Sequence, residues 1–318
     1  MWRRLLKGLP PVAGVLLAVS MISFALVAFL PGDLALVMLG DSATPETLAI
    51  ARREMGLDRP LHERYLQWLG NALQGDFGRS MRSGEPVTDA ILARLPVTLE
   101  LMLLTIALAL VLSIPLGVWT AYRREGWVDR AAMSLSLVFL STPSFLMGVL
   151  LVYFVALQLQ WLPATGYIPV SESVTGNLQL MVLPVLALAL HDVPIYLRVL
   201  RSEMIQTLQQ NFILLARGMG LPVATILVRN ALRPASLNLV TTVGLTIGRL
   251  LGGALTIEVL FGLPGLGQLL VESVYQKEYQ MMQAIVLFVA IGFVVINLLV
   301  DLLYVVLDPR LRDDRTAS

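Results

Sequence analysis

The stretch TLELMLLTIALALVLSIPLGVWTA, residues 98–121, is almost entirely apolar and carries a single charged side chain, Glu100. A helix needs about 20 mainly apolar residues to cross the hydrocarbon of a lipid bilayer. This stretch is therefore long enough and apolar enough to form a transmembrane helix, and it indicates a membrane protein.

The whole composition agrees with this interpretation. The chain has 318 residues, of which 57% are hydrophobic and 14% are charged, and its mean hydropathy is +0.77. An ordinary soluble domain carries about 25% charged residues. The formal net charge of +1 gives no indication of nucleic-acid binding.

Several kinds of chemistry are excluded or disfavoured by residue counts. Cysteine is absent, which excludes disulfides, thiolate metal sites and cysteine nucleophiles. His62 and His191 are the only histidines, so we predict no metal site and no catalytic residues. Lys7 and Lys277 are the only lysines, and neither lies in a phosphate-binding-loop motif. If ATP drives this protein, another chain must hydrolyse it.

Runs of similar length and hydropathy predict an all-α integral membrane protein with six transmembrane helices. The runs are residues 9–30, 98–121, 131–157, 180–200, 236–260 and 281–307. A signal peptide is the alternative for the first run, but its length of about 22 residues and the lack of a convincing cleavage site favour a retained anchor. Bends are expected at the prolines inside the runs, which are Pro115, Pro143, Pro184 and Pro194.

Basic residues in the short connections set the orientation. Arginine and lysine gather before the first run, in YRREGWVDR between the second and third, between the fourth and fifth, and after the sixth. The positive-inside rule then places both termini in the cytoplasm. The segment 31–96 also holds arginines, but it is long, and long translocated segments largely escape that rule.

Segment 31–96 is therefore expected outside the membrane as a small helical subdomain. TPETLAIARREMGLD reads as an amphipathic helix capped near Thr44 or Thr47, and LHERYLQWLGNALQGDFGRSM as a second helix that ends at Gly75. We predict three parts: residues 1–30 as the cytoplasmic N-terminus and first transmembrane helix, 31–96 as the external subdomain, and 97–318 as the transmembrane core. The core includes a cytoplasmic loop at 201–235.

Residues 211–234, NFILLARGMGLPVATILVRNALRP, are too polar to cross a bilayer and too apolar for a loose loop. Phe212, Leu215 and Met219 fall on one helical face, and a Gly-Leu-Pro break at Gly220 separates this helix from a second. Two short helices with a bend are predicted, presented to a partner protein. The alternative is an amphipathic loop lying in the membrane interface.

Within this stretch, ARGMGL followed by RNALRP resembles the coupling motif of ABC importer permeases. Other segments resemble the first permease subunit of the dipeptide/oligopeptide/nickel permease family in the same order. They are FLPGD, EMGLDRPLHERYLQWLGNALQGDFGRS, RLPVTLEL, STPSF, WLPATGY, EVLFGLPGLGQLLVESV and NLLVDLLYVVLDPRLR. The resemblance covers nearly the whole chain and implies a type I ABC importer permease fold.

The resemblance also implies a function and partners. It predicts an ATP-driven importer subunit that takes up small peptides or peptide-like solutes through a bacterial inner membrane. A homologous second permease, two ATPase chains that bind ATP and Mg²⁺, and an external solute-binding protein would complete it. This chain would bind no cofactor and no nucleic acid, and would do no covalent chemistry.

The resemblance assigns a coupling role to seven residues of the 211–234 stretch. They are Asn211, Leu215, Ala216, Arg217, Gly220, Asn230 and Pro234. Ala216 and Gly220 are four residues apart on one helical face, and their small size would let a partner approach closely. Gly220 would also end the helix.

Charged groups in the hydrocarbon are costly and are candidates for function. His191 and Asp192 lie in the fourth run and Arg249 in the fifth, so these three are candidates for the substrate pathway. Arg249 could instead be a structural partner of Asp192 or of a carbonyl freed by a glycine, and His191 a hydrogen-bonded packing residue. If Arg249 lines the wall of the translocation path, its guanidinium would attract a carboxylate or phosphate of the solute.

FGLPGLGQLL, which follows Glu258, resembles the re-entrant external turn of the family. The predicted gate or turn residues are Glu258, Phe261, Pro264, Gly265 and Gly267. Glycines at 244, 248, 252 and 253 permit close helix contact, and we expect this helix to meet the partner permease.

Two alternatives belong to other functional classes. An ion-coupled secondary transporter working alone would use intramembrane carboxylates and often shows inverted repeats, which this sequence lacks. An intramembrane hydrolase would need His191 and Asp192 as an acid–base pair, but no nucleophile motif accompanies them.

Overall fold

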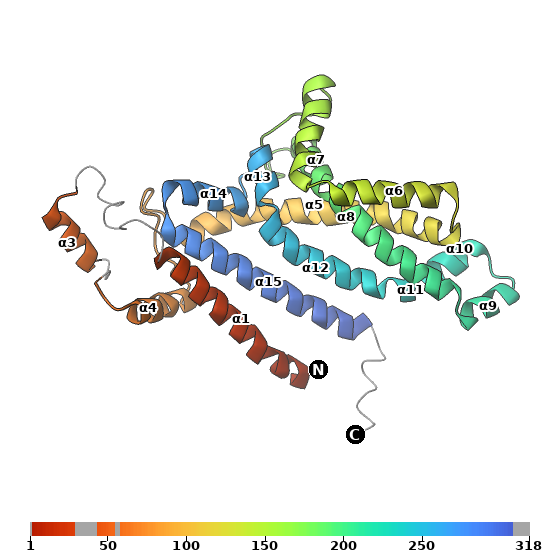
Figure 1. The fold of residues 1–318 in the computed structure, drawn as a ribbon, viewed down its shortest axis with the longest axis horizontal. Coiled ribbons are helices and arrows are strands. Elements are labelled where there is room, and N and C mark those ends of the chain that lie inside the picture. Colours follow the sequence, from red (N-terminus) through yellow and green to blue (C-terminus); the bar gives the residue numbers. More distant parts are fainter. Residues whose placement is uncertain (1, 29–42, 55–57, 308–318) are drawn as a thin grey trace. The chain divides into compact units, whose positions relative to one another are not determined.

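The structure is a computed structural model that describes residues 2–28, 43–54 and 58–307 (Figure 1). The described elements are helical. They are α1 (Trp2–Ala28), α3 (Pro45–Glu54), α4 (Leu61–Leu73), α5 (Val87–Tyr122), α6 (Trp127–Ser141), α7 (Ser144–Leu151), η2 (Val152–Gln158), α8 (Val174–Leu208), α9 (Asn211–Gly218), α10 (Val223–Thr225), η3 (Ile226–Ala231), α11 (Leu232–Ala235), α12 (Leu237–Gly253), α13 (Leu255–Phe261), α14 (Leu266–Gln276) and α15 (Tyr279–Leu307). Contacts divide the chain into unit 1, Met1–Pro96 with Gln268–Val294, and unit 2, Val97–Gly267 with Val295–Ser318.

Both the continuous helices and the bent helix pairs are long enough to cross a membrane. Helices α5, α8 and α15 are each long and apolar enough to cross a membrane, and three bent helix pairs raise the count to as many as six among the described residues. These pairs are α6 with α7–η2, α10–α11 with α12, and α13 with α14. In α1 the apolar part is the shorter segment Ala13–Ala25.

Only one of the expected proline bends is a full break. The run at 131–157 is bent by 101° between α6 and α7, where Pro143 is the residue that precedes α7. Proline before a helix loses no internal hydrogen bond, because the first N–H groups are unpaired in any case. Pro184 and Pro194 instead lie inside the continuous helix α8, and Pro115 lies inside α5.

Unit 2 is organised around α8, drawn in green in Figure 1. Helices α6, α7, α11, α12 and α13 all pack against it. A core of small and apolar side chains joins α8 to α5, α9, η3, α11 and α12. Its buried members are Ala109, Ala121, Ala189, Tyr196, Leu200, Met204, Ile213, Ala216, Ile226, Ala231, Ala235 and Leu239.

Unit 1 contains both helices predicted for the external segment. Helix α3 begins after Thr44, whose Oγ1 accepts from the Thr47 N–H, while Thr47 Oγ1 accepts from the Thr44 N–H. This reciprocal cap satisfies the first N–H groups of the helix. Helix α4 ends before Gly75, which has a φ of +83°. Both predicted helices are confirmed.

Helix α4 packs against α1 within the same unit. The Tyr65 hydroxyl is 2.8 Å from Ser20 Oγ, and the Phe24 ring packs edge-on to Tyr65 with 5.5 Å between centroids. A further hydrogen bond within unit 1 joins Ser80 Oγ to Glu278 Oε1 at 2.8 Å. The predicted division into parts 1–30, 31–96 and 97–318 stays a prediction.

Candidate functional site

Helix α9 presents an apolar face to its surroundings. Phe212, Leu215 and Met219 are 47%, 64% and 65% exposed. On the opposite face, Ile213 and Ala216 are buried in the core of unit 2. The helix is therefore fixed to its own chain on one side and open on the other.

The end of α9 is a glycine-dependent cap, as predicted. Gly220 has a φ of +76°, and its N–H donates to the Arg217 carbonyl at 3.0 Å. The Leu221 N–H donates to the Ala216 carbonyl at 3.2 Å. This pair of bonds is the Schellman motif, which satisfies the last carbonyls of a helix and places glycine in the left-handed region.

Ala216 corrects one part of the sequence interpretation. The helical wheel placed Ala216 and Gly220 together as a surface for a partner, yet Ala216 is buried among residues of its own chain and Gly220 is exposed. The small size of Ala216 therefore permits close packing inside unit 2. The exposed coupling candidates on α9 and its cap are Asn211, Leu215, Arg217 and Gly220.

The second predicted short helix is also present, and it contains a π-helical segment. Asn230 lies half-buried in η3, and Pro234 lies exposed in α11. Pro234 has no N–H to donate to the Asn230 carbonyl, so a regular α-helical bond is lost there. A bend of 54° separates this stretch from α12.

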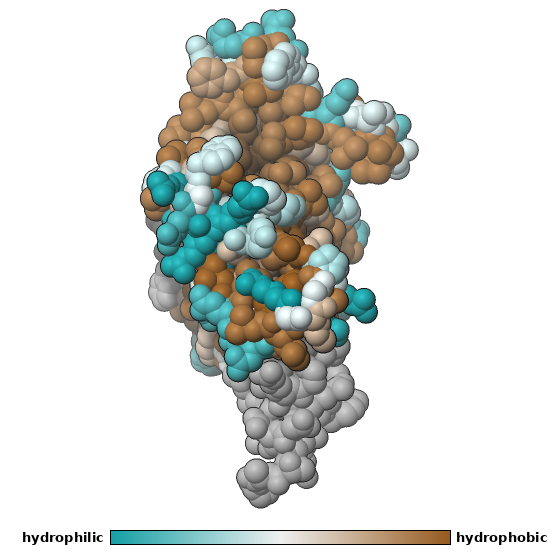
Figure 2. Space-filling model, turned by 90° about the vertical axis from the view of Figure 1, so that its right-hand side faces the viewer, coloured by the Kyte–Doolittle hydropathy of each residue, from teal (hydrophilic) through white to brown (hydrophobic). Residues whose placement is uncertain are grey.

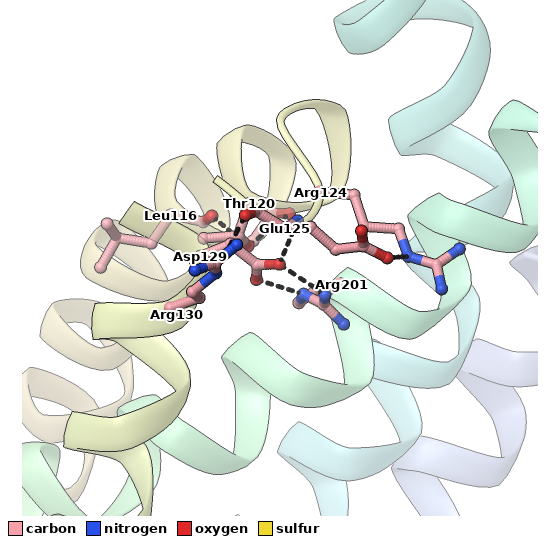
Figure 3. A network of polar contacts seen from close by, with 8 residues as sticks. Leu116, Thr120, Arg124, Glu125, Asp129, Arg130 and Arg201 are labelled. Atoms are coloured by element: carbon pink, nitrogen blue, oxygen red, sulfur yellow. Dashed lines mark hydrogen bonds and ion pairs between the residues drawn. The ribbon is translucent and has the colours of Figure 1, made fainter. Parts of the chain in front are cut away.

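A buried ion pair that the sequence did not predict fixes α6 to α8. Arg201 Nε and Nη2 donate to the two carboxylate oxygens of Asp129, each at 2.7 Å (Figure 3). Asp129 Oδ2 also accepts from the Glu125 N–H at 2.9 Å, and Glu125 has a φ of +64°. Two-point pairing of this kind is geometrically specific. It holds the connection between α5 and α6 against α8.

The structure brings together the charged residues predicted within the spans. Arg249 on α12 donates from Nη2 to Asp192 Oδ1 on α8. The Asp192 side chain is fully buried, whereas 43% of the Arg249 side chain remains exposed. The predicted pairing of Arg249 with Asp192 is therefore present, and a place for Arg249 on the solute pathway stays a prediction.

Two buried atoms at this pair are left without hydrogen bonds. They are Asp192 Oδ2 and His191 Nδ1, and neither has a partner within the described part of the chain. Among residues 2–28, 43–54 and 58–307, no three histidine, cysteine, aspartate or glutamate residues are grouped so that they could hold a metal ion.

Glu258 is fully buried and organises the predicted external turn. Its Oε1 accepts from the Thr98 hydroxyl at 2.7 Å, and its Oε2 accepts from the Gly267 N–H at 2.7 Å. Thr98 Oγ1 in turn accepts from the Leu266 N–H at 2.9 Å. The first two N–H groups of α14 are therefore capped by side chains from α5 and α13.

Two positions of the turn require glycine because neighbouring atoms lie too close for a Cβ. A Cβ on Gly265 would lie 2.4 Å from the Glu258 carboxyl, and a Cβ on Gly267 would lie 2.5 Å from the Leu255 Cα. Phe261 is buried, and Gly262 ends α13 with a φ of +64°. At Gly265 and Gly267, a side chain larger than hydrogen would clash with its neighbours.

The loop after η2 contacts this turn within unit 2. The Gly166 N–H donates to the Phe261 carbonyl at 3.0 Å, and the Tyr167 hydroxyl donates to Glu100 Oε2 at 2.8 Å. Burial, reinforced by the hydrogen bond to Glu100, raises the pKa of Tyr167 to about 12. The phenol therefore stays protonated and donating at physiological pH.

Of the predicted small-residue face on α12, Gly244 and Gly248 are buried inside the chain. A Cβ on Gly244 would lie 2.4 Å from Val300 of α15, so Gly244 lets these two helices pack closely. Gly252 and Gly253 are exposed, and a Cβ added to either of them would have no described atom within 4 Å. The contact of this helix with a partner permease stays a prediction.

Comparison with solved structures places the fold among ABC importer permeases. A chain of the MetNI methionine ABC transporter matches with a TM-score of 0.58 and 17% identity, over 69% of this chain and 96% of that chain. The fold is that of a type I ABC importer transmembrane subunit, in agreement with the sequence prediction.

Sequence relatives define the family. The model of the binding-protein-dependent transport system inner membrane component matches residues 113–313, and the model of its N-terminal region matches residues 1–102. A putative peptide transport system permease protein of Brucella abortus is 40% identical over 98% of this chain and 99% of the relative. The glutathione transport system permease protein GsiC of Salmonella choleraesuis is 36% identical over 96% and 98%.

The chain belongs to the family of binding-protein-dependent transport system inner membrane components. It is a multi-pass membrane protein with a transport role. This assignment favours the importer over a lone ion-coupled transporter and over an intramembrane hydrolase.

Proposed function

We propose that this chain is the transmembrane subunit of an ATP-driven importer for small peptides or peptide-like solutes. Two relatives that match over nearly their full length carry the names of peptide and glutathione transport permeases, which supports this solute class. The family description supports delivery of the solute by a separate binding protein.

In the proposed assembly, the chain pairs with a homologous second permease and forms half of the translocation pathway. Two ATPase chains bind ATP and Mg²⁺ on the cytoplasmic side of a bacterial inner membrane, and a solute-binding protein docks outside. Both termini of this chain would be cytoplasmic. The chain itself converts ATPase motion into a change of access to the pathway.

The carrying observation is the two-faced helix α9. Its buried face, Ile213 and Ala216, belongs to the core of unit 2, whereas Phe212, Leu215 and Met219 are exposed. An exposed apolar face on a helix that is fixed to the core favours docking to a partner protein. A force applied to α9 by an ATPase would therefore reach α8 through shared core residues.

The test compares two leucines of matched exposure, Leu215 on α9 and Leu66 on α4, which are 64% and 63% exposed. Leu215→Asp should reduce ATPase co-purification about 30-fold or more, because a charge placed in the centre of an interface weakens the binding free energy by at least about 2 kcal/mol. Leu66→Asp should leave co-purification unchanged. Equal retention of the ATPase by both variants would contradict docking through α9.

We further propose that Arg249 lines the solute pathway. Asp192 is fully buried and accepts from one side of the guanidinium, while 43% of the Arg249 side chain remains exposed. The remaining N–H donors can bind a carboxylate, which every peptide carries at its C-terminus. In this scheme Asp192 holds Arg249 from behind and does not touch the solute, and His191, its neighbour on α8, stays a candidate for the pathway.

Substitution of Arg249 separates this role from a structural one. Arg249→Lys keeps the positive charge beside Asp192 and should retain part of the uptake, whereas Arg249→Leu should abolish uptake while the ATPase still co-purifies. Uptake by Arg249→Leu at the wild-type rate, at equal expression, would exclude Arg249 from the pathway.

The turn around Glu258 is proposed as the external gate. It includes Phe261, Pro264, Gly265 and Gly267, and it is tied to α5 through Thr98. Movement of α5 relative to α13 would have to break the hydrogen bonds of Thr98. We therefore expect the turn to switch between two defined conformations and not to deform gradually.

A further inference from the structure

A cavity lined by arginines lies beside α9, and Arg217 is its only lining residue among the coupling candidates. Its volume is about 770 Å³, and it is enclosed by the end of α5, the end of α8, and the segment from α9 to η3. Three of its lining residues are arginines, namely Arg123, Arg124 and Arg217, and no lining residue is acidic. A cavity of this size is typical of sites that bind small molecules.

Few anionic groups compensate these arginines inside the protein. Arg124 has an exposed contact of 3.5 Å with Glu125, and the carboxylate of Asp129 is already occupied by Arg201. Arg123 lies over the Trp119 ring, 5.5 Å from its centroid. Neither Arg123 nor Arg217 forms a salt bridge with any described residue. The cavity therefore offers guanidinium donors to an external anion.

The remaining wall is mainly apolar, with Gln209 and the Tyr122 hydroxyl as its polar groups. Leu208, Leu221 and Val223 line it together with Ile205, Ile226 and Leu227. Figure 2 faces the end of the molecule that carries α9 and α10, where hydrophilic side chains lie among hydrophobic ones. A free inorganic anion gains nothing from such a wall, whereas an amphipathic ligand buries its apolar part there.

An exposed apolar stripe on α5 ends beside Arg123, which lines the cavity. Leu112, Leu116 and Trp119 are exposed at spacings of four and three residues and so form one stripe, which continues to Arg123. Trp127, at the start of α6, is 81% exposed. Exposed tryptophans at the end of a transmembrane helix are typical of the membrane interface, where their rings lie at headgroup level.

We propose that this cavity binds the phosphate headgroup of an anionic phospholipid from the same leaflet. Arg123, Arg124 and Arg217 donate to the phosphate, for which the planar guanidinium is well suited. The acyl chains run along the α5 stripe. Basic cavities between transmembrane helices on the cytoplasmic side are suited to anionic headgroups. The proposal rests on the orientation given above, which places this end of α5 in the cytoplasm.

The test uses the purified complex with its ATPase chains, mixed with phosphatidylglycerol or phosphatidylcholine and examined by native mass spectrometry. Wild type should retain phosphatidylglycerol more strongly than phosphatidylcholine, because the choline cation offsets the phosphate charge and is repelled by the arginines. Arg123→Gln/Arg124→Gln should bind phosphatidylglycerol roughly 30-fold more weakly, which is the effect of two interfacial arginines. Arg123→Lys/Arg124→Lys should retain most of the binding. The matched control Arg59→Gln/Arg82→Gln removes two exposed arginines of unit 1 and should bind as wild type does.

Three results would overturn the proposal. The first is equal phosphatidylglycerol binding by the Arg123→Gln/Arg124→Gln variant and the control. The second is displacement of the lipid by inorganic phosphate alone, because that identifies a free-anion site. The third is loss of ATPase co-purification in the Arg123→Gln/Arg124→Gln variant, because that places the cavity in the protein interface. Since co-purification is measured separately, failure of the lipid site leaves the importer function intact.

Discussion

Substitution of Thr98 by valine tests how the external turn is held. Thr98 and Thr105 both lie on α5, and they are only 1% and 0% exposed. Thr98 Oγ1 donates to Glu258 and accepts from the Leu266 N–H, whereas Thr105 Oγ1 has no partner among the described residues. The two threonines are a matched pair that differs in hydrogen bonding.

Valine keeps nearly the same shape and removes the hydroxyl. Thr98→Val removes one hydrogen bond to the Glu258 carboxylate and leaves the buried N–H of Leu266 without its acceptor. A hydrogen bond to a charged group contributes about 1.5–3 kcal/mol and an unsatisfied buried N–H costs about 1–3 kcal/mol, so the free energy of unfolding should fall by roughly 2–6 kcal/mol. Thr105→Val removes a hydroxyl that is already unpaired, so it should be neutral or stabilising by about 1 kcal/mol.

Unfolding by sodium dodecyl sulfate in mixed micelles, followed by helical circular dichroism, measures both variants. The uptake rate should also fall for Thr98→Val alone, because the turn is the proposed external gate. If Thr98→Val and Thr105→Val change the free energy of unfolding equally, the hydrogen bonds around Glu258 do not stabilise the turn, and the reasoning is refuted.

Three further substitutions give distinct outcomes. Gly220→Ala meets no atom within 4 Å in this chain but needs a φ of +76°, so it should destabilise by about 1 kcal/mol and lower the thermal midpoint slightly; a loss of expression would indicate a contact that this geometry does not contain. Arg201→Gln leaves the buried Asp129 carboxylate unpaired and should cost about 3–5 kcal/mol in unfolding free energy; a change under about 1 kcal/mol would show that the pair is solvated. Gly265→Ala would place a Cβ 2.4 Å from the Glu258 carboxyl, so the chain should fail to accumulate in the membrane at wild-type levels, and normal expression would contradict that packing.

The sequence was sufficient for the features that have a local signal. Apolar length predicted the spans at 98–121 and 180–200, which lie inside α5 and α8. The glycine that ends α9 was predicted from its position after an amphipathic run, because only a left-handed residue permits the Schellman bonds. The pairing of Arg249 with Asp192 was one of three predicted possibilities, beside a bond to a freed carbonyl and a place on the pathway wall, since a charge inside a span needs a partner.

Features that depend on distant residues were not predicted. Asp129 and Arg201 are 72 residues apart in the sequence, and Thr98 and Glu258 are 160 apart. No local pattern specifies which polar side chain meets another across that separation. The orientation of Ala216 was missed for a different reason: a helical wheel shows which residues share a face, but it does not show which face packs on the protein itself.

ATP-dependent uptake of a radiolabelled dipeptide into vesicles that contain this chain tests the central claim most directly. The vesicles would contain the co-expressed second permease, with or without the ATPase chains, and the binding protein would be added outside. The account predicts uptake only when the ATPase chains and ATP are present, and its loss in the Leu215→Asp variant. Uptake that continues without the ATPase chains, driven by an ion gradient, would contradict the account and support a transporter that works alone.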